Sequence, residues 1–294
     1  MTDSRLPSIC LVTPCYNHGD SVEDTIESVL SQRYPKLEYI VINDGSTDES
    51  EAVIQRYSQQ LHYWENWPGY RPGPAPAINR GFSFSSGEIM GWLNSDDLLM
   101  PKSLFVVAEV FAQFPQVDWI TGVATVLDSE GRYVRSREYR KNKYDYLVGD
   151  WPVIQQESTF WRRSLWEAAG SGLDASLAVA FDSELWCRFF LHARHYHLDC
   201  PLGAYRKVPQ STSIKKAHEF SQVTENALRD FRDAAPANVA RRRTHYRFFK
   251  SLLRLFGSPV FKSWLGRLFG VPDFQYQSIT YEPDAGKWRI YSRW

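Results

Sequence analysis

The chain has 294 residues but only four cysteines, Cys10, Cys15, Cys187 and Cys200. Their spacing contains no Cys-x-x-Cys pair and no other zinc pattern, which argues against a zinc site built on cysteine thiolates. Nothing in the pattern suggests a disulfide framework, so we expect reduced thiols in a cytosolic protein.

Long apolar runs are also missing. No segment approaches the roughly 18 consecutive apolar residues of a membrane-spanning helix, and residues 1–7 lack the apolar region of a signal peptide. We therefore expect a cytoplasmic protein that is neither exported by that route nor integral to a membrane.

Net charge is absent too, since 34 Lys and Arg residues balance 34 Asp and Glu residues. The distribution is uneven, because residues 229–270 contain ten Lys or Arg and only two Asp. A basic tail on an acidic body favours an anionic surface as the partner of the tail. We expect no nucleic acid partner.

What is present is a regular alternation of strand and helix patterns. Short, nearly continuous apolar runs predict parallel strands that are buried on both faces, at Ser8–Thr13, Leu37–Ile42, Leu61–Trp64 and Glu88–Leu93. Helical patterns separate them, among them one after a capping box of Ser46 and Glu49. The order predicts a doubly wound, mostly parallel α/β sheet. Further strands are predicted at Val117–Leu127, Arg132–Arg137, Ser158–Trp161 and Tyr196–Tyr205.

The fourth strand leads into Asn94-Ser95-Asp96-Asp97, and a helix is predicted to start near Pro101. Two adjacent carboxylates at the carboxyl end of a buried strand are costly unless a cation meets them. In an open α/β sheet this end is where ligands bind, and Mg²⁺ or Mn²⁺ prefers carboxylate oxygens. The pattern favours a metal–diphosphate site at Asp96. The alternative is that these residues only turn the chain and cap the next helix.

Four groups of residues together resemble the family 2 glycosyltransferases. They are Pro14-Cys15-Tyr16-Asn17, Asn43-Asp44-Gly45-Ser46-Thr47-Asp48, the run from Ala77 through Gly87-Glu88 to Asp97, and Gln156–Arg163 followed by Phe181–Trp186. The resemblance implies a GT-A fold, which is Rossmann-like with helices on both faces of the sheet. It implies a catalytic domain over residues 1–216, with a nucleotide-binding half (1–120) and an acceptor-binding half (121–216). A basic, mainly helical C-terminal extension would cover residues 217–294.

This resemblance implies an inverting transfer of a sugar from a nucleotide-diphosphate donor, expected to be a UDP-sugar, to a hydroxyl of a glycan or lipid-linked saccharide. Such an enzyme uses Mn²⁺ or Mg²⁺ as its cofactor. Asp96 matches the family's direct metal ligand, Asp182 its catalytic base and Asp44 its base-binding aspartate. Glu157 and Glu184 are reserve candidates for the catalytic base.

The remaining candidate residues follow from the same resemblance. Those matched to nucleotide binding, besides Asp44 and Asp96, are Thr13, Pro14, Tyr16, Asn17, Asn79 and Ser95; those matched to the donor and acceptor loops are Asn94, Asp97, Glu157 and Arg206. Tyr16 could lie along the base, and Asn17 could equally be a turn residue. Asp97 could cap the next helix or support the metal site. Arg206 or Lys207 could meet the diphosphate or be a solvated loop charge.

Two departures from the family pattern stand out. Asn94 carries an amide where many relatives have a carboxylate, and Val208 stands where relatives often have a histidine. The proline-rich segment Trp67–Pro76 corresponds to a loop that borders the sugar site and could act as a lid. Trp151, Trp161 and Trp166 could stack on an acceptor sugar or belong to the core.

The tail contains two helical patterns with apolar faces. Phe249, Leu252, Leu253 and Phe256 fall on one face of the first, with Arg243, Arg247, Lys250 and Arg254 elsewhere around it; Phe261, Trp264, Leu265 and Leu268 mark the second. Basic amphipathic helices predict peripheral attachment to an anionic lipid surface, here the inner face of the membrane. The alternative is a helical region packed on the catalytic domain. Tyr276–Trp294 is strand-like at best.

Two other functions compete. A sugar-phosphate nucleotidyltransferase also uses acidic metal ligands, but it would carry a Gly-rich loop with Arg and Lys after the first strand, and Pro14–Gly19 lacks that pattern. A non-catalytic scaffold that binds sugar nucleotides at the membrane surface would use the basic tail, and Asn94 and Val208 leave room for it.

Overall fold

The first strand, Ile9–Cys15 (β1), lies inside a nine-stranded sheet with every residue buried. Its side chains alternate between two hydrophobic cores, since Cys10 and Val12 face one core and Ile9 and Leu11 the other. Both faces of the sheet are therefore covered, which explains the nearly continuous apolar sequence of this strand.

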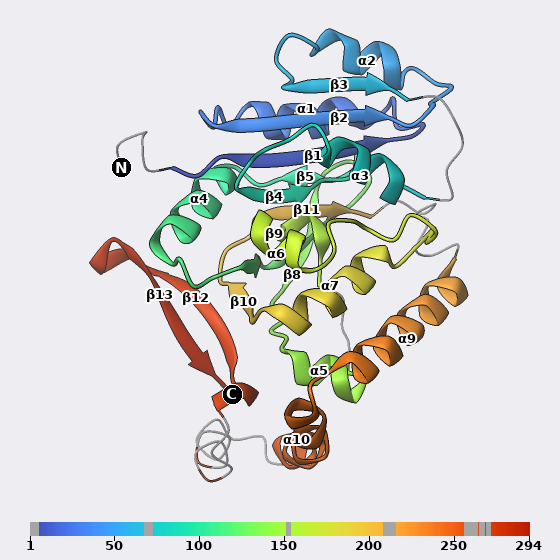
Figure 1. Ribbon diagram of the computed structural model, residues 1–294. Helices are drawn as coiled ribbons and strands as arrows, with labels where there is room; N and C mark the ends of the chain where they lie inside the picture. The colour runs from blue at the N-terminus through green and yellow to red at the C-terminus, as the bar shows by residue number, and fades with distance from the viewer. Residues whose placement is uncertain are drawn as a thin grey trace.

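The computed structural model describes residues 6–67, 73–150, 154–207, 216–255, 264, 268 and 272–294. The main sheet has the order β13-β12-β10-β6-β9-β4-β1-β2-β3 (Figure 1). Its other strands are β2 (Leu37–Asn43), β3 (Tyr63–Asn66), β4 (Ile89–Trp92), β6 (Trp119–Thr121), β9 (Thr159–Arg162), β10 (His195–Leu198), β12 (Tyr276–Glu282) and β13 (Lys287–Arg293). Strands β9 and β13 are antiparallel to their neighbours, and the other pairs are parallel.

A smaller sheet has the order β5-β11-β7-β8, formed by β5 (Leu98–Leu99), β7 (Ala124–Leu127), β8 (Tyr133–Arg137) and β11 (Gly203–Arg206). The helices are α1 (Val22–Leu30), α2 (Ser50–Arg56), α3 (Ala75–Phe82), α4 (Ser103–Gln113), α5 (Lys143–Val148), α6 (Arg163–Ala168), α7 (Phe181–His192), α9 (Ala217–Ala234) and α10 (Ala237–Leu255). Helices α1, α2 and α4 cover one face of the main sheet, and α3, α6 and α7 cover the other. The predicted mixed α/β fold with a mostly parallel sheet is confirmed.

Strand β1 extends two residues further than predicted and includes Pro14. The N–H of Leu93 donates to the carbonyl of Val12, and the N–H of Asp44 donates to that of Cys15. Neighbouring residues of a strand bond to opposite sides, so Pro14 faces β4 beyond the last paired residue of that strand. Its missing N–H therefore removes no ladder bond.

The prediction of one strand over Val117–Leu127 is wrong, because this segment forms β6 and β7 in different sheets. The chain changes sheet at Gly122, where an added Cβ would lie 2.6 Å from the carbonyl oxygen of Cys200. That oxygen accepts the N–H of Val123 at 3.0 Å. The predicted strand Tyr196–Tyr205 is split in the same way, into β10 and β11.

The predicted capping box of Ser46 and Glu49 is also wrong, because α2 begins at Ser50 and Glu49 makes no side-chain capping bond. The hydroxyl of Ser46 instead accepts the N–H of Asn17 at 3.0 Å. Asp48 accepts the N–H of Ser50 at 3.0 Å, which satisfies a donor at the start of the helix.

Beyond residue 216 the chain is helical up to Leu255, as predicted. Residues 276–293 then form the hairpin β12–β13, and β12 pairs in parallel with β10. The predicted extension 217–294 therefore completes the sheet that the predicted catalytic domain begins. Among the described helices, none is long and apolar enough to cross a membrane.

Of the apolar face predicted on α10, Phe249 and Leu252 point inward, and the side chains of Leu253 and Phe256 lie outside the described part of the chain. Phe249 is 2% exposed, its ring centroid lies 5.9 Å from that of Phe274 and 5.5 Å from that of Trp294, and Leu252 packs against the same core. For these residues the structure supports the packed helical region and contradicts insertion into lipid. Of the second predicted apolar face, only Trp264 and Leu268 are described; both are helical and exposed.

One basic side chain of α10 is not a solvated charge. Lys250 pairs with Asp145, which is fully buried on α5, and with Asp150. The hydroxyl of Tyr246 donates to the same Asp145 carboxylate at 2.8 Å. This network fixes α10 to α5.

Replacing Phe249 by alanine is expected to lower the free energy of unfolding by about 3–5 kcal/mol, because the change opens a cavity between α10 and the C-terminal hairpin. Urea unfolding followed by tryptophan fluorescence measures this. Phe248→Ala is the matched control, since its side chain is 58% exposed and should cost about 1 kcal/mol or less. Equal losses for the two variants would contradict the inward packing of α10.

Candidate active site

Loops that follow β1 and β2 are held together at the carboxyl edge of the main sheet. The side-chain oxygen of Asn17 accepts the N–H of Thr47 at 2.8 Å, and Asp48 accepts the N–H of Gly19 at 2.9 Å. Asn17 has a φ of 54°, a conformation that asparagine tolerates better than most residues. The structure thus supports the turn role of Asn17.

The candidate nucleotide-binding residues divide into buried and exposed groups. Thr13 and Pro14 are buried in β1, and the Thr13 hydroxyl lies 3.0 Å from that of Tyr39. Asp44 is 8% exposed at the end of β2, whereas Tyr16 is 50% exposed. Of this group, the ring of Tyr16 is the part most available to a ligand.

The segment after β4 carries the two candidate acidic residues in different environments. Asp96 is partly exposed, whereas Asp97 is fully buried. Burial raises the pKa of Asp96, and the neighbouring His18 and Arg206 offset part of that effect. The partly exposed carboxylate of Asp96 can therefore reach a ligand.

Asp97 connects three elements. Its carboxylate accepts the N–H of Arg206 on β11 at 3.0 Å, the amide N–H of Asn94 at 3.2 Å and that of Gln156 at 3.3 Å. Helix α4 begins six residues later with Lys102 at its cap position, so the interpretation of Asp97 as a helix cap is wrong. It supports the segment that carries Asp96.

The acidic groups near Asp97 are buried close together, so each disfavours ionisation of the others. Burial first, and then the neighbouring Asp96, hold the pKa of Asp97 well above its usual range. Glu157 is 3% exposed, and burial followed by the charges of Asp97, Asp182 and Asp96 holds its pKa well above its usual range. Such a group of carboxylates suits a divalent cation.

Asp182 is the second residue of α7, which begins directly after Ala180, whose φ of 56° turns the chain into the helix. Its carboxylate accepts the N–H of Ser183 at 2.8 Å. Burial raises the pKa of Asp182 to about 6, and that bond offsets part of the rise. A carboxylate with such a pKa can accept a proton near neutral pH.

A tryptophan stack connects α7 to β4. The ring of Trp186, one turn after Asp182, stacks on Trp92 with centroids 5.8 Å apart and an interplanar angle of 10°. The ring of Phe181 also lies beside that of Trp92, with centroids 6.1 Å apart. Because Trp92 lies four residues before Asp96, this packing fixes the two candidate carboxylates relative to one another.

Three other candidate residues have defined partners. Arg206 is 6% exposed and pairs with Asp24 on α1 at 2.9 Å, so the interpretation as a solvated charge is wrong.

The side-chain amide of Asn79 donates to the carbonyl of Leu173 and accepts the N–H of the same residue, with both distances 2.8 Å. This geometry assigns Asn79 to holding the loop before α7. The reserve candidate Glu184 pairs with Arg188 at 2.7 Å.

Two residues at this edge of the sheet were not identified as site residues from the sequence. The imidazole of His18 lies 2.7 Å from the hydroxyl of Ser95, which is itself 2% exposed. Asp24 pairs with one terminal nitrogen of Arg206 although 182 residues separate the two in the chain. Histidine at a strand-to-loop turn was a signal for the first, whereas nothing local marked the second.

Aromatic candidates for acceptor stacking lie in the core where they are described. Trp161 is 0% and Trp166 5% exposed, so stacking on a sugar is excluded for them in this structure. Trp151, Val208 and residues 68–72 of the predicted lid lie outside the described residues.

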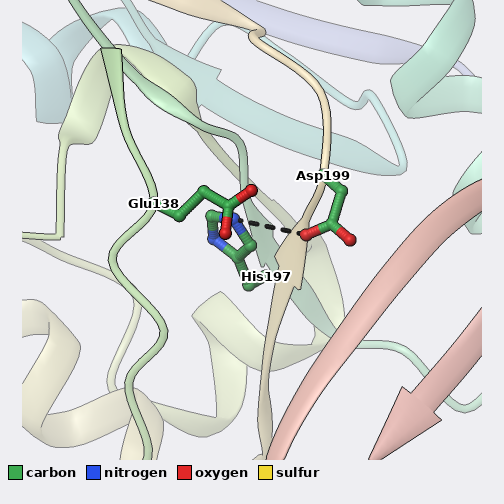
Figure 2. Close-up of side chains that lie close together, drawn as sticks. All are labelled: Glu138, His197 and Asp199. Carbon is green, nitrogen blue, oxygen red and sulfur yellow. Dashed lines mark ion pairs between the residues drawn. The ribbon is translucent and has the colours of Figure 1, made fainter. Parts of the chain in front are cut away.

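A second group of potential metal ligands lies elsewhere in the fold. Figure 2 shows Glu138, His197 and Asp199 close together, with ligand atoms within 4.8 Å of one another. Arginines already neutralise the carboxylates, since Arg140 contacts both at 2.6 and 3.2 Å and Arg293 pairs with Asp199 at 2.8 Å. These three side chains could hold a cation only where it displaced Arg140, so we assign them a structural role.

Comparison with solved structures places this fold among the glycosyltransferases. TarS of S. aureus in complex with UDP-GlcNAc matches with a TM-score of 0.67 and 17% identity, over 91% of this chain and 78% of that chain. The mannosyltransferase PcManGT from Pyrobaculum calidifontis in complex with GDP-Man and Mn²⁺ matches with a TM-score of 0.55 and 16% identity, over 91% and 86% of the two chains.

Sequence comparison agrees. An uncharacterised glycosyltransferase of Rickettsia typhi is 26% identical over 189 residues, which are 62% of this chain and 58% of the relative. The poly-beta-1,6-N-acetyl-D-glucosamine synthase of Staphylococcus epidermidis is 31% identical over 118 residues, 40% of this chain and 29% of the synthase. This chain thus matches less than two thirds of the length of either relative. Residues 10–206 match the family described as Glycosyl transferase family 2, and the chain therefore belongs to this family of enzymes, with the GT-A fold that the sequence predicted.

Proposed function

We propose that the protein transfers a sugar from a UDP-sugar to a hydroxyl of a glycan or lipid-linked saccharide, with inversion at the anomeric carbon. The observation that carries the proposal is the Trp92–Trp186 stack, which connects the segment of Asp96 to the helix of Asp182. UDP-GlcNAc bound to the structural neighbour TarS supports the choice of donor.

In this proposal the loops after β1 and β2 bind the nucleoside. Asp44 accepts a hydrogen bond from the N3–H of the uracil, and the exposed ring of Tyr16 stacks against the base. Asn17 fixes the two loops to each other through Thr47, so it acts by holding the site together. Thr13 and Pro14 form the buried floor of this site.

Asp96 would hold Mn²⁺ or Mg²⁺, with Asn94 offering its side-chain oxygen, because the amide N–H of Asn94 is used by Asp97. The bound ion would neutralise the diphosphate leaving group. Arg206 is in electrostatic contact with Asp96 and adds positive charge on the same side. The Mn²⁺ complex of PcManGT supports this assignment.

Asp182 would take the proton from the acceptor hydroxyl as that oxygen attacks the anomeric carbon, and UDP would leave from the opposite face. Its raised pKa suits this role. Glu157 is buried behind Asp97, and Glu184 is paired with Arg188, so neither is as well placed as Asp182.

The test is to incubate the protein with a panel of UDP-sugars, Mn²⁺ and extracts of candidate acceptors, and to measure UDP release. We expect acceptor-dependent release with at least one donor. Tight binding of UDP without turnover on any acceptor would overturn the proposal in favour of a non-catalytic scaffold. Release of pyrophosphate from UTP and a sugar phosphate would point to a nucleotidyltransferase.

Replacing Tyr16 by alanine is expected to weaken UDP binding by about tenfold, since stacking of a base on an aromatic ring contributes roughly 1–3 kcal/mol. Isothermal titration calorimetry with UDP measures the effect. Tyr133→Ala on β8 is the control, because its side chain is 67% exposed and lies outside the proposed site. An unchanged affinity in Tyr16→Ala would remove this residue from the nucleotide site.

A further inference from the structure

Three arginines lie on α9 and α10, and Arg243 is near enough to the other two to interact with them electrostatically. Arg232 is in the last turn of α9, and Arg243 and Arg247 are one turn apart on α10. Burial, and then the positive charges of Arg232 and Arg247, lower the pKa of Arg243. The guanidinium group of Arg243 is therefore repelled by those of Arg232 and Arg247.

Three other basic side chains of the same two helices have acidic partners, whereas Arg241 donates to the carbonyl of Ala237. Arg242 pairs with Asp273 at 2.7 Å, Arg229 lies 3.9 Å from Asp230, and Lys250 pairs with Asp145. Within the described part of the chain, no ion pair joins Arg232, Arg243 or Arg247 to a carboxylate. Like charges gathered without a counter-charge are unfavourable unless an anion completes the group.

The contacts of Arg232 are fixed, whereas the Nε of Arg243 lacks a hydrogen-bond partner among the described residues. The Nε of Arg232 donates to the carbonyl of Leu147 at the end of α5, at 3.1 Å. Its guanidinium also packs against Gly149, where an added Cβ would lie 3.2 Å from a terminal nitrogen. The Nε of Arg243 is buried and makes no hydrogen bond in the described structure. A buried donor without a partner is uncommon and indicates a missing acceptor.

We propose that Arg232, Arg243 and Arg247 form a binding site for the phosphate group of an anionic ligand. Guanidinium groups match phosphate oxygens in pairs, with short charge-assisted hydrogen bonds. The site is separate from the proposed donor site, because α10 lies at the far end of the molecule from β2 and β3 (Figure 1). In this proposal a partly buried group of arginines, and not insertion into lipid, is what the tail contributes.

The experiment uses the full chain and inorganic polyphosphate as the probe. We expect polyphosphate to raise the melting temperature of the wild type, because a ligand that binds the folded state stabilises it. Arg243→Gln and Arg247→Gln should lose most of this increase and bind at least tenfold more weakly. Without polyphosphate they should melt at or above the wild-type temperature, since each removes a repelling charge.

Arg229→Gln is the matched control, because its charge already lies near Asp230 and its loss should leave the response to polyphosphate unchanged. UDP binding should be the same in all variants, which separates this site from the donor site. An equal response in wild type and Arg243→Gln, or no response in the wild type, would overturn the proposal.

A second arm identifies the source of the phosphate. Vesicles of phosphatidylglycerol in phosphatidylcholine are sedimented with wild type and with Arg243→Gln. Co-sedimentation that is lost in Arg243→Gln supports the site with a lipid headgroup as its ligand. Binding of polyphosphate alone supports it with a soluble phosphate ester, and co-sedimentation that is equal for both proteins counts against it.

Discussion

Replacing Asp182 by asparagine is expected to lower the rate of sugar transfer by about 10²–10⁴-fold, the usual cost of removing a general base. An amide of almost the same size keeps the packing of α7 but cannot accept the proton. UDP binding should change little, because Asp182 is assigned to the acceptor side. Acceptor-dependent UDP release, with titration calorimetry for UDP, measures both quantities.

The pH dependence gives a second readout of the same residue. Since the pKa of Asp182 is about 6, the ionised base is lost as the pH falls through that value. The kcat/KM of the wild type should therefore be about tenfold lower at pH 5 than at pH 7. The residual activity of Asp182→Asn should lack this decrease.

Glu184→Gln is the matched control, because Glu184 lies half a turn away on the same helix and is paired with Arg188. It should keep transfer within a few fold of the wild type. A loss in Glu184→Gln as large as that in Asp182→Asn would mean that the variants act through the helix, and the assignment of the base would fail.

Replacing Asp96 by asparagine is also expected to lower the rate of sugar transfer strongly. We expect Mn²⁺-dependent transfer to fall by about 10²-fold or more, because metal stabilisation of a departing oxygen contributes several kcal/mol. The Mn²⁺ dependence of UDP binding should disappear in parallel. Calorimetry with and without Mn²⁺ measures the binding term.

The control for Asp96→Asn is the wild-type protein from which the metal ion has been removed. Asp96→Asn in Mn²⁺ should behave like wild type in EDTA, in both UDP affinity and transfer. Equal stimulation of the two proteins by Mn²⁺ would place the ion elsewhere, and Glu138, His197 and Asp199 would then have to be reconsidered.

Local sequence was sufficient to predict the elements whose structure depends on burial alone. The apolar runs of β1, β2 and β4 predicted strands because both faces of the sheet are covered, and their carboxyl ends predicted where Asp44 and Asp96 would lie. Family resemblance added the role of Asp182, which periodicity could not supply.

Contacts between distant parts of the chain were not predictable in this way. The break between β6 and β7 depends on the carbonyl of Cys200, 78 residues after Gly122 (200 − 122). Likewise, the inward face of α10 depends on Phe274 and Trp294. An amphipathic pattern predicts that one face of a helix will be buried, but it does not predict which part of the protein or which partner covers that face.

Pairing of β12 with β10 has a consequence for synthesis. Residues 195–198 leave the ribosome long before residues 276–282. The edge of β10 that later pairs with β12 is therefore unpaired while some 80 residues are added. Unpaired edges of this kind recruit other strands. Slow elongation across α9 and α10 should therefore favour aggregation of nascent chains, and chaperones should bind most strongly in that interval.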